Sequence, residues 1–318
     1  MSTITILDGY TLNPGDLDWA PISRLGETAI FERTAPGQLL ERAAGAKLLV
    51  VNKFVLGEEQ LSQLPQLRCI CVSATGYNNV DVGAARRRNI PVCNVVGYST
   101  EAVAQHVFAL LLALTNRVES HHRSVAEGQW NASPDFSYTL QPIPELAGRT
   151  MGIYGFGRIG QQVTAIARAF GMEALATHKH PERDAQAGVR FVSLEELFET
   201  SDAISLHAPL TAENEQIVDA RLLRRMRPGA YLINTGRGGL IHEADLRQAL
   251  QEGRLAGAAL DVLSQEPPPA GHPLIGLPNC LITPHLAWAS QEARARLLAE
   301  TAANIEAFLA GNPRNVVN

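Results

Sequence analysis

The 318-residue chain is long enough for about two domains. Its composition, 46% hydrophobic and 19% charged, is ordinary for a globular protein with a large core. The formal net charge of −5 argues against broad binding to nucleic acids or anionic membranes. We find no signal-peptide pattern in "MSTITILDGY" and no apolar run long enough to cross a bilayer, and we therefore expect a cytoplasmic protein.

The first part of the chain alternates short β-branched segments with helical segments, which predicts a parallel α/β sheet. The predicted strands are 4–7, 48–52, 69–74 and 90–95, and helices at 58–64 and 82–89 separate some of them.

The four cysteines, Cys69, Cys71, Cys93 and Cys280, do not have the spacing of a zinc site, and no metal site is predicted. Cys69 and Cys71 share one predicted strand, and we expect their side chains to point to opposite faces of it. Buried, reduced thiols are the favoured interpretation, and they fit a cytoplasmic location.

Residues 99–118 predict a helix whose apolar side chains cover nearly its whole surface. Such a helix is buried, in part by a second subunit if the protein is a dimer. The long loop-like stretch that follows, 129–148, is expected to be an arm used in dimerisation. These segments predict a homodimer formed through the second domain.

A second series of strands is predicted at 151–155, 173–178, 203–207, 230–235, 257–262 and 280–284. Six strands with intervening helices make a doubly wound, Rossmann-type nucleotide domain. The amphipathic helix at 290–311 is expected to return to the first domain. The predicted organisation is therefore a substrate domain, 1–98 plus 287–318, with a dinucleotide-binding domain, 99–286, inserted into it and a cleft between them.

The segment "GIYGFGRIG" places Gly155, Gly157 and Gly160 directly after a strand and before a helix. In such a loop the first glycine permits the turn, the second lets the backbone approach a pyrophosphate, and the third lets the helix pack on the strand. A glycine turn without a ligand is the alternative. The strand–turn–helix context favours a dinucleotide site.

Polar residues follow most of the predicted strands, at the edge where ligands of open α/β sheets bind. Three of them form a chemical set. His285 can donate a proton, Glu266 can orient its ring, and Arg237 offers a planar fork that matches a carboxylate or a 2-oxo acid. Taken singly, they could be a structural histidine, a solvated turn residue and a surface arginine. Their joint placement near strand ends favours catalysis.

These segments resemble the D-isomer-specific 2-hydroxyacid dehydrogenases. The matching stretches are "ATGYNNVD" (74–81), "STEAVAQHVFALLLAL" (99–114), "ELAGRTMGIYGFGRIG" (145–160), "LHAPLT" (206–211), "INTGRGGLI" (233–241), "ALDVLSQEP" (259–267) and "TPHLAWAS" (283–290). Two of them, "ATGYNNVD" and "PHLAWAS", look most like those of glycerate dehydrogenases, also called hydroxypyruvate reductases.

The resemblance implies a flavodoxin-like substrate domain and an enzyme that reversibly reduces a 2-oxo acid with NAD(P)H. It implies catalytic roles for Arg237, Glu266 and His285, and a backbone loop at Thr75 and Gly76 that binds the substrate carboxylate. It implies cofactor contacts for the three glycines and for Arg158, Ile159, His207, Pro209, Thr235, Gly236 and Asp261, the last at the nicotinamide amide.

Two further residues are candidate substrate contacts. Trp288 is expected either to wall the substrate pocket or cover the nicotinamide ribose, or to serve in interdomain packing. Lys53 is expected either to reach the substrate or to be a solvated surface residue.

Several related functions remain open. A formate dehydrogenase is disfavoured because that subgroup lacks the glutamate partner of its histidine. A short phosphoglycerate dehydrogenase, a D-lactate dehydrogenase and a non-catalytic NAD(H)-sensing interaction protein remain alternatives.

In "ATHKH", His178 falls where this family usually places an aspartate that binds the adenosine ribose. Without that acid a 2′-phosphate is not repelled, and Lys179, His180 and Arg183 could attract it. We therefore expect NADPH to be accepted, alone or beside NADH. If His178 helps as a cation, NADPH affinity should weaken above about pH 6.5. An exposed turn whose basic residues touch nothing is the alternative.

Overall fold

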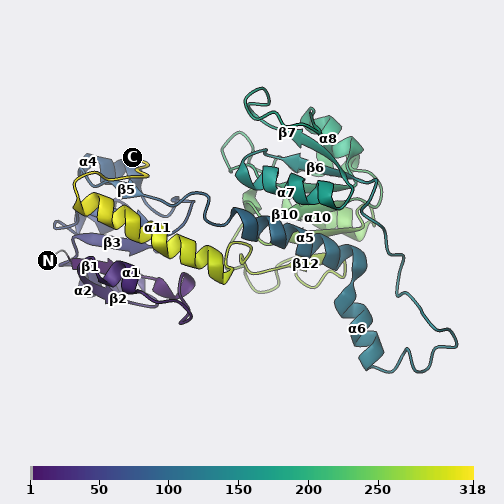
Figure 1. Ribbon diagram of the computed structural model, residues 1–318, viewed down its shortest axis with the longest axis horizontal. Coiled ribbons are helices and arrows are strands. Elements are labelled where there is room, and N and C mark those ends of the chain that lie inside the picture. The colour runs from purple at the N-terminus through teal and green to yellow at the C-terminus, as the bar shows by residue number, and fades with distance from the viewer. Residues whose placement is uncertain (1–2) are drawn as a thin grey trace. The chain divides into compact units, whose positions relative to one another are not determined.

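The computed structural model describes residues 3–318, which form two compact units: one made of residues 3–99 and 288–318, the other of residues 100–287. Both units are α/β with parallel sheets, as predicted (Figure 1). Among the described residues, no helix is both long and apolar enough to span a membrane.

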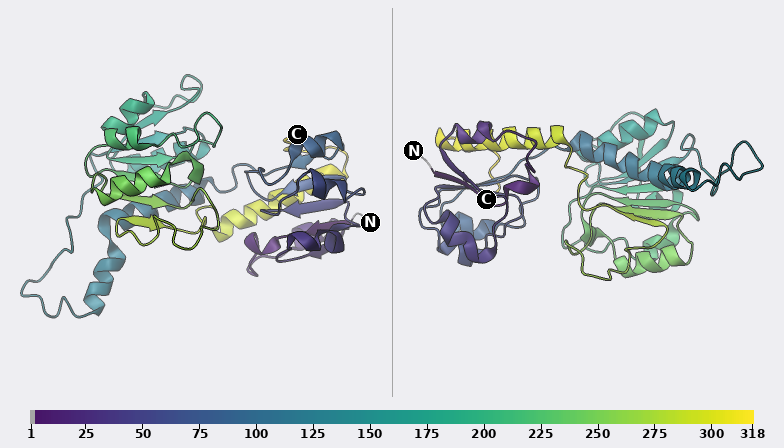
Figure 2. Two further views of the ribbon diagram at one scale, coloured as in Figure 1. Left: turned by 180° about the vertical axis from the view of Figure 1, so that it is seen from behind. Right: turned by 90° about the horizontal axis from the view of Figure 1, so that it is seen from below.

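The first unit has a five-stranded sheet in the order β2-β1-β3-β4-β5, which is the flavodoxin-like order. The strands are β1 (Thr3–Ile6), β2 (Glu27–Ile30), β3 (Leu48–Val51), β4 (Cys69–Val72) and β5 (Val92–Cys93). The helices are α1 (Ala20–Ser23), α2 (Leu39–Ala43), α3 (Glu58–Ser62), α4 (Val82–Arg87) and α11 (Gln291–Leu309). Helices α2, α3 and α4 pack on one face of the sheet, whereas α1 and α11 lie together on the other (Figure 2).

The second unit has a seven-stranded parallel sheet in the order β12-β11-β10-β9-β6-β7-β8. The strands are β6 (Thr150–Tyr154), β7 (Glu173–Thr177), β8 (Val189–Phe191), β9 (Ala203–Leu206), β10 (Tyr231–Asn234), β11 (Gly257–Leu260) and β12 (Cys280–Ile282). The helices are α5 (Thr100–Asn116), α6 (Val118–Ala126), α7 (Arg158–Ala169), α8 (Leu194–Thr200), α9 (Ala220–Arg225) and α10 (Glu243–Gln251). Strand order reverses between β6 and β9, and ligands of open α/β sheets bind at such switch points.

Two buried cores hold the second unit together, one on each face of its sheet. Side chains of α8, α9 and α10 pack on one face, and side chains of α5 and α7 pack on the other. Helix α6 and the segment after it extend away from the sheet (Figure 1).

The predicted number of strands was too low in each unit, because β2 and β8 were missed. Both are short strands at the edge of their sheet. The expectation that Cys69 and Cys71 point to opposite faces was also wrong, because residues two apart on a strand share a face. Cys71 lies opposite Cys93 on the neighbouring strand. All four cysteines are buried and free, as expected.

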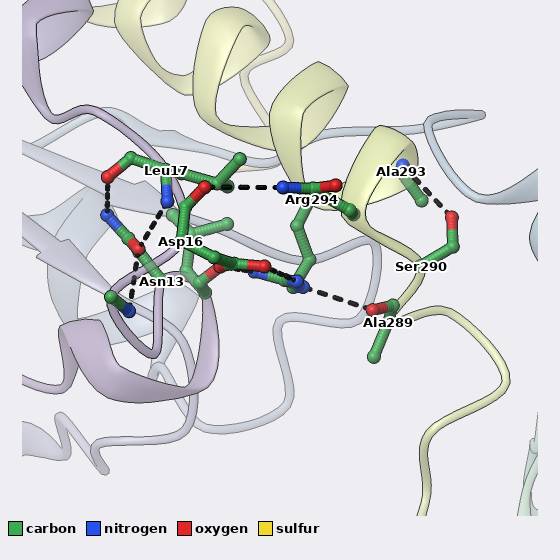
Figure 3. Close-up of polar contacts among 10 residues, drawn as sticks. Asn13, Asp16, Leu17, Ala289, Ser290, Ala293 and Arg294 are labelled. Carbon is green, nitrogen blue, oxygen red and sulfur yellow. Dashed lines mark hydrogen bonds and ion pairs between the residues drawn. The ribbon is translucent and has the colours of Figure 1, made fainter.

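The start of α11 is fastened to the N-terminal part of the first unit by Arg294 (Figure 3). Its guanidinium donates two hydrogen bonds of 2.6 Å to the carboxylate of Asp16 and one of 3.0 Å to the carbonyl of Ala289. The side chain of Asn13 closes the turn that presents Asp16, through bonds to the backbone of Gly15 and Leu17. This cluster fixes the backbone that follows Trp288.

Candidate active site

The glycine loop after β6 lies at the switch point of the second sheet. Gly155 has a φ of +96°, and a Cβ there would lie 2.5 Å from the backbone nitrogen of Ala208, which follows β9. Only glycine allows both this conformation and this close approach. The loop is therefore held against the backbone that carries His207 and Pro209.

The rest of the loop has the space and the polarity for a pyrophosphate. A Cβ on Gly160 would lie 2.4 Å from the carbonyl oxygen of Gly155, whereas Gly157 faces open space. Within residues 3–318 no side chain caps the N-terminus of α7, where Arg158 and Ile159 lie. Its N–H groups and helix dipole are thus available to an anion.

Thr235 and His207 lie at the ends of the strands beside this loop. The hydroxyl of Thr235 is buried and has no hydrogen-bond partner among the described residues. A buried hydroxyl of this kind can form a hydrogen bond to a bound ligand. The His207 ring bonds to the hydroxyl of Ser205 at 2.9 Å, and burial lowers the pKa of His207 to about 3. His207 is therefore neutral at physiological pH and shapes the site without adding charge.

His285 and Glu266 form a direct pair, with 2.6 Å between His285 Nδ1 and Glu266 Oε2. The other oxygen of Glu266 accepts the backbone N–H of Leu263 at 3.0 Å, which orients the carboxylate. When Nδ1 donates to the carboxylate, Nε2 is the ring nitrogen left for a substrate. The imidazole is only partly buried, with 28% of its side chain exposed.

Asp261 braces the loop that carries His285. Its buried carboxylate accepts hydrogen bonds from the Thr283 hydroxyl and the Leu286 N–H on Oδ1, and from the Ala287 N–H on Oδ2. Oδ2 keeps one acceptor position. His285 itself adopts the left-handed region, at φ 53°, and its N–H bonds to the carbonyl of Asp261 at 2.8 Å. A non-glycine residue keeps that conformation only where its surroundings impose it.

A second histidine, His106, contacts the residues that hold the His285 loop. His106, on α5, approaches Thr283 Oγ1 to 3.1 Å and Asp261 Oδ1 to 3.6 Å. Burial lowers the pKa of His106, although the charge of Asp261 acts in the opposite direction. The contacts from His106 through Thr283 to Asp261 thus connect the His285 loop to helix α5, which packs on the sheet.

Arg237 follows β10 in a turn that is packed tightly against the Glu266 turn. The carboxamide of Asn234 bridges this turn, donating to the carbonyl of Arg237 at 2.8 Å and accepting from Gly236 at 3.0 Å. A Cβ on Gly238 would lie 1.9 Å from the carbonyl carbon of Leu263. The absence of a side chain at Gly238 therefore lets the Arg237 turn and the Glu266 turn lie in contact.

The remaining candidates belong to the first unit. Lys53 follows β3, and Thr75 and Gly76 follow β4, so they lie at the carboxyl ends of paired strands. The carboxylate of Asp8 accepts the N–H groups of residues 52, 53 and 54, which fixes the turn that carries Lys53. The Thr75 hydroxyl bonds to the carbonyl of Val95 at 2.8 Å.

Trp288 packs against Tyr98, with ring centroids 6.2 Å apart and an edge-to-face angle of 77°. Both residues lie in the first unit, next to the two positions where the chain passes between units. The next residue, Ala289, is held through its carbonyl by Arg294 (Figure 3). The position of Trp288 is therefore held by Tyr98 and by the backbone of Ala289.

The segment after β7 differs from a turn whose basic residues touch nothing. His178 Nε2 lies 2.7 Å from Asp184 Oδ2, and Arg183 also bonds to Asp184. His178 Nδ1 accepts the backbone N–H of Phe156, in the glycine loop, at 3.2 Å. Nε2 is thereby directed to Asp184. That His178 helps as a cation stays a prediction.

Several residues that support the site are absent from the sequence-based candidates, among them Asp8, His106, Asn234, Thr283 and Asp184. Asp8 and Asn234 lie at or just after the ends of strands, so the search for polar residues at strand ends could have found them. His106 lies on helix α5 and Asp184 in a loop, and their roles depend on contacts with Thr283 and His178 that the sequence alone does not show.

The family model described as "D-isomer specific 2-hydroxyacid dehydrogenase, NAD binding domain" matches residues 108–287. The chain is 43% identical over 320 residues to the hydroxypyruvate reductase of Blautia hydrogenotrophica, covering 99% of each chain. It is 43% identical over 290 residues to the glycerate dehydrogenase of Methylorubrum extorquens, covering 90% of each. A solved structure, the NADPH-dependent glyoxylate/hydroxypyruvate reductase of Sinorhizobium meliloti in complex with citrate, superposes with a TM-score of 0.84 at 28% identity, covering 100% of this chain and 98% of that one.

The chain therefore belongs to the D-isomer-specific 2-hydroxyacid dehydrogenase family and carries its NAD-binding domain. It is an oxidoreductase of the NAD(P)-dependent class that acts on 2-oxo and 2-hydroxy acids. The fold and the family expected from the sequence are both confirmed.

Proposed function

We propose that this enzyme reversibly reduces a small 2-oxo acid, hydroxypyruvate or glyoxylate, to the D-2-hydroxy acid with NAD(P)H. The observation that carries the proposal is the 2.6 Å bond between His285 and Glu266, in the same unit as a glycine loop that is open at Gly157. The names of the similar enzymes, hydroxypyruvate reductase and glycerate dehydrogenase, support the substrate.

His285, Glu266 and Arg237 would carry the chemistry. When bound, the reduced nicotinamide supplies the hydride to the carbonyl carbon. His285 Nε2 protonates the carbonyl oxygen as negative charge develops there, while Glu266 fixes the ring through Nδ1. The guanidinium of Arg237 holds the 2-oxo acid through charge-assisted hydrogen bonds. Backbone N–H groups near Thr75 and Gly76, together with Lys53, would bind the carboxylate, and Trp288 would limit the size of the substrate.

The second unit would hold the cofactor along the carboxyl ends of its strands. Gly155, Gly157 and Gly160 and the first turn of α7 would take the pyrophosphate. Thr235, Gly236, His207 and Pro209 would line the path toward the nicotinamide. The free acceptor position on Asp261 would suit the N–H of the nicotinamide amide.

We also propose that NADPH is accepted beside NADH. Position 178 has histidine rather than an acid, and Lys179 is an exposed cation beside it. Lys179→Ala should weaken NADPH binding several-fold while NADH binding stays within about twofold, because an exposed charge contributes modestly. A strict NADH preference that Lys179→Ala leaves unchanged would refute this.

A panel of 2-oxo acids tests the function. Measurement of kcat/KM for hydroxypyruvate, glyoxylate, pyruvate, 3-phosphohydroxypyruvate and a bulkier branched acid, each with NADH and NADPH, should give the highest values for the first two. A preference for pyruvate or the phosphorylated acid would point to a D-lactate or phosphoglycerate dehydrogenase. Cofactor binding without turnover of any acid would favour the NAD(H)-sensing alternative.

The arm after α6 supports a homodimer. Trp130, Phe136, Leu140 and Ile143 expose apolar side chains there, and 91% of the Phe136 side chain is accessible. The arm is ordered from within, because Trp130 bonds to the carbonyl of Phe136 and His121 accepts the N–H of Leu140. Ordered, exposed apolar patches mark interaction surfaces. We propose a second copy of the chain as the partner.

Light scattering coupled to size-exclusion chromatography tests the dimer. Phe136→Asp should shift the protein to monomer, whereas Val55→Asp, at an exposed apolar residue of the first unit, should not. A monomeric wild-type protein at micromolar concentration would overturn the proposal.

The four buried, free cysteines support a cytoplasmic location, where thiols stay reduced.

A further inference from the structure

The end of β7 places one histidine between the glycine loop and a carboxylate. His178 accepts the N–H of Phe156 on one ring nitrogen and contacts Asp184 with the other. Its ring also packs edge-on against the buried ring of Phe156, at a centroid distance of 6.5 Å. The imidazole of His178 therefore bridges the carboxylate of Asp184 and the loop that would bind the pyrophosphate.

The backbone N–H of Phe156 determines which ring nitrogen of His178 donates and which accepts in these hydrogen bonds. Because Phe156 can only donate, His178 Nδ1 accepts and Nε2 carries the proton. Nε2–H then donates to Asp184 Oδ2 at 2.7 Å. The imidazole thus positions the carboxylate of Asp184 beside the glycine loop.

Arg183 also contacts this carboxylate, through Nε to both oxygens and through Nη2 to Oδ2. The bonds from Arg183, followed by that from His178, lower the pKa of Asp184 to about 2. Asp184 is therefore ionised throughout the physiological pH range. Arg183 is largely exposed, whereas only 19% of the Asp184 side chain is accessible.

We propose that Asp184 supplies, from the loop, the acid that position 178 lacks, and that it limits how well NADPH is used. The inference rests on the proposed binding of a dinucleotide at the Gly155 loop. An ionised carboxylate at the ribose end accepts a hydrogen bond from a 2′-hydroxyl and repels a 2′-phosphate. Lys179 acts in the opposite direction. Arg183, which pairs with Asp184, is a second cation in this loop. The balance of Asp184 against Lys179 and Arg183 makes the enzyme accept both cofactors without strong preference.

The test compares two acid-to-amide changes in the same loop. Asp184→Asn removes the negative charge with little change in shape, whereas Glu182→Gln removes a charge that lies near His180 and does not contact His178. Dissociation constants for NADH and NADPH are measured by quenching of protein fluorescence, so no substrate is needed. Thermal melting checks that both variants are folded.

Asp184→Asn should raise the ratio of NADPH to NADH affinity about tenfold, as expected when a nearby like charge is removed at a partly exposed site. Glu182→Gln should change the ratio less than about twofold, because exposed charges farther away are screened. An unchanged ratio in Asp184→Asn, or an equal shift in both variants, would overturn the role of Asp184. Failure of the proposed oxidoreductase activity would appear separately, as dinucleotide binding without turnover.

Discussion

The loop that carries His285 and the segment that carries His178 both follow strands of the second sheet, yet they are held very differently. The first is braced by the buried carboxylate of Asp261, which binds one side chain and two backbone groups. The second depends on one imidazole and on ion pairs near the surface. With the proposed roles of His285 and His178, proton transfer would depend on a loop braced by the core, whereas cofactor choice would depend on side chains that can change without disturbing that core.

Removal of His285 should have the largest effect. His285→Ala should lower kcat by about 10²–10⁴-fold, the usual contribution of a general acid, with both cofactors affected equally. Cofactor dissociation constants should stay within about twofold. His180→Ala, at an exposed histidine of the other region, is the control and should keep normal turnover. Near-normal activity in His285→Ala would remove the proton-donor role.

Loss of the carboxylate at Glu266 should come next. In Glu266→Gln the ring of His285 loses the acceptor that fixes Nδ1, and misalignment of a catalytic group costs up to about 10²-fold in rate. We expect kcat to fall while KM for the 2-oxo acid changes little. A rise in KM alone would indicate that Glu266 binds substrate instead.

Asp261→Asn tests the brace itself. An amide nitrogen in place of one oxygen would face the N–H of Leu286 or Ala287, and each unsatisfied buried donor costs about 1–3 kcal/mol. Urea denaturation should show this loss of stability, accompanied by a lower kcat. Asp135→Asn, in the exposed arm, is the matched control and should change neither quantity. Unaltered stability in Asp261→Asn would mean that the loop keeps its conformation by other means.

The smallest effect is expected at the Asp16–Arg294 pair, outside both regions. The hydrogen bond from Arg294 lowers the pKa of Asp16 below its usual value of 3.8. The stabilisation is therefore fully present above about pH 4 and is lost as pH falls through the lower pKa of the folded state. Denaturation curves between pH 2.5 and 6 should show a shallower acid-dependent loss in Asp16→Asn than in the wild type. Parallel curves would show that the pair adds nothing to stability.

The fold was largely predictable because buried parallel strands appear as continuous apolar runs. The strands that were missed lack such runs. Strand β2, Glu27–Ile30, and strand β8, Val189–Phe191, lie at sheet edges and have no fully buried residue. Local sequence carries little signal for such strands, because their pairing is determined by the neighbour they join.

The candidate site was predictable at the strand ends, where parallel topology collects functional side chains. Its supports were not predictable, because most act on backbone atoms. Asp261 was assigned to the cofactor, and the hydrogen bonds by which it holds the His285 loop give no pattern in the sequence. Asp184 lies six residues beyond His178 in an irregular segment, so only the three-dimensional structure shows that this acid lies beside His178.

The central claim concerns the reaction itself, and the chirality of its product tests it most directly. Purified enzyme is supplied with hydroxypyruvate and NADH or NADPH, and the glycerate formed is resolved by chiral chromatography. The account predicts steady oxidation of the reduced cofactor and D-glycerate as the product. Formation of L-glycerate, or no consumption of cofactor with any 2-oxo acid, would contradict it.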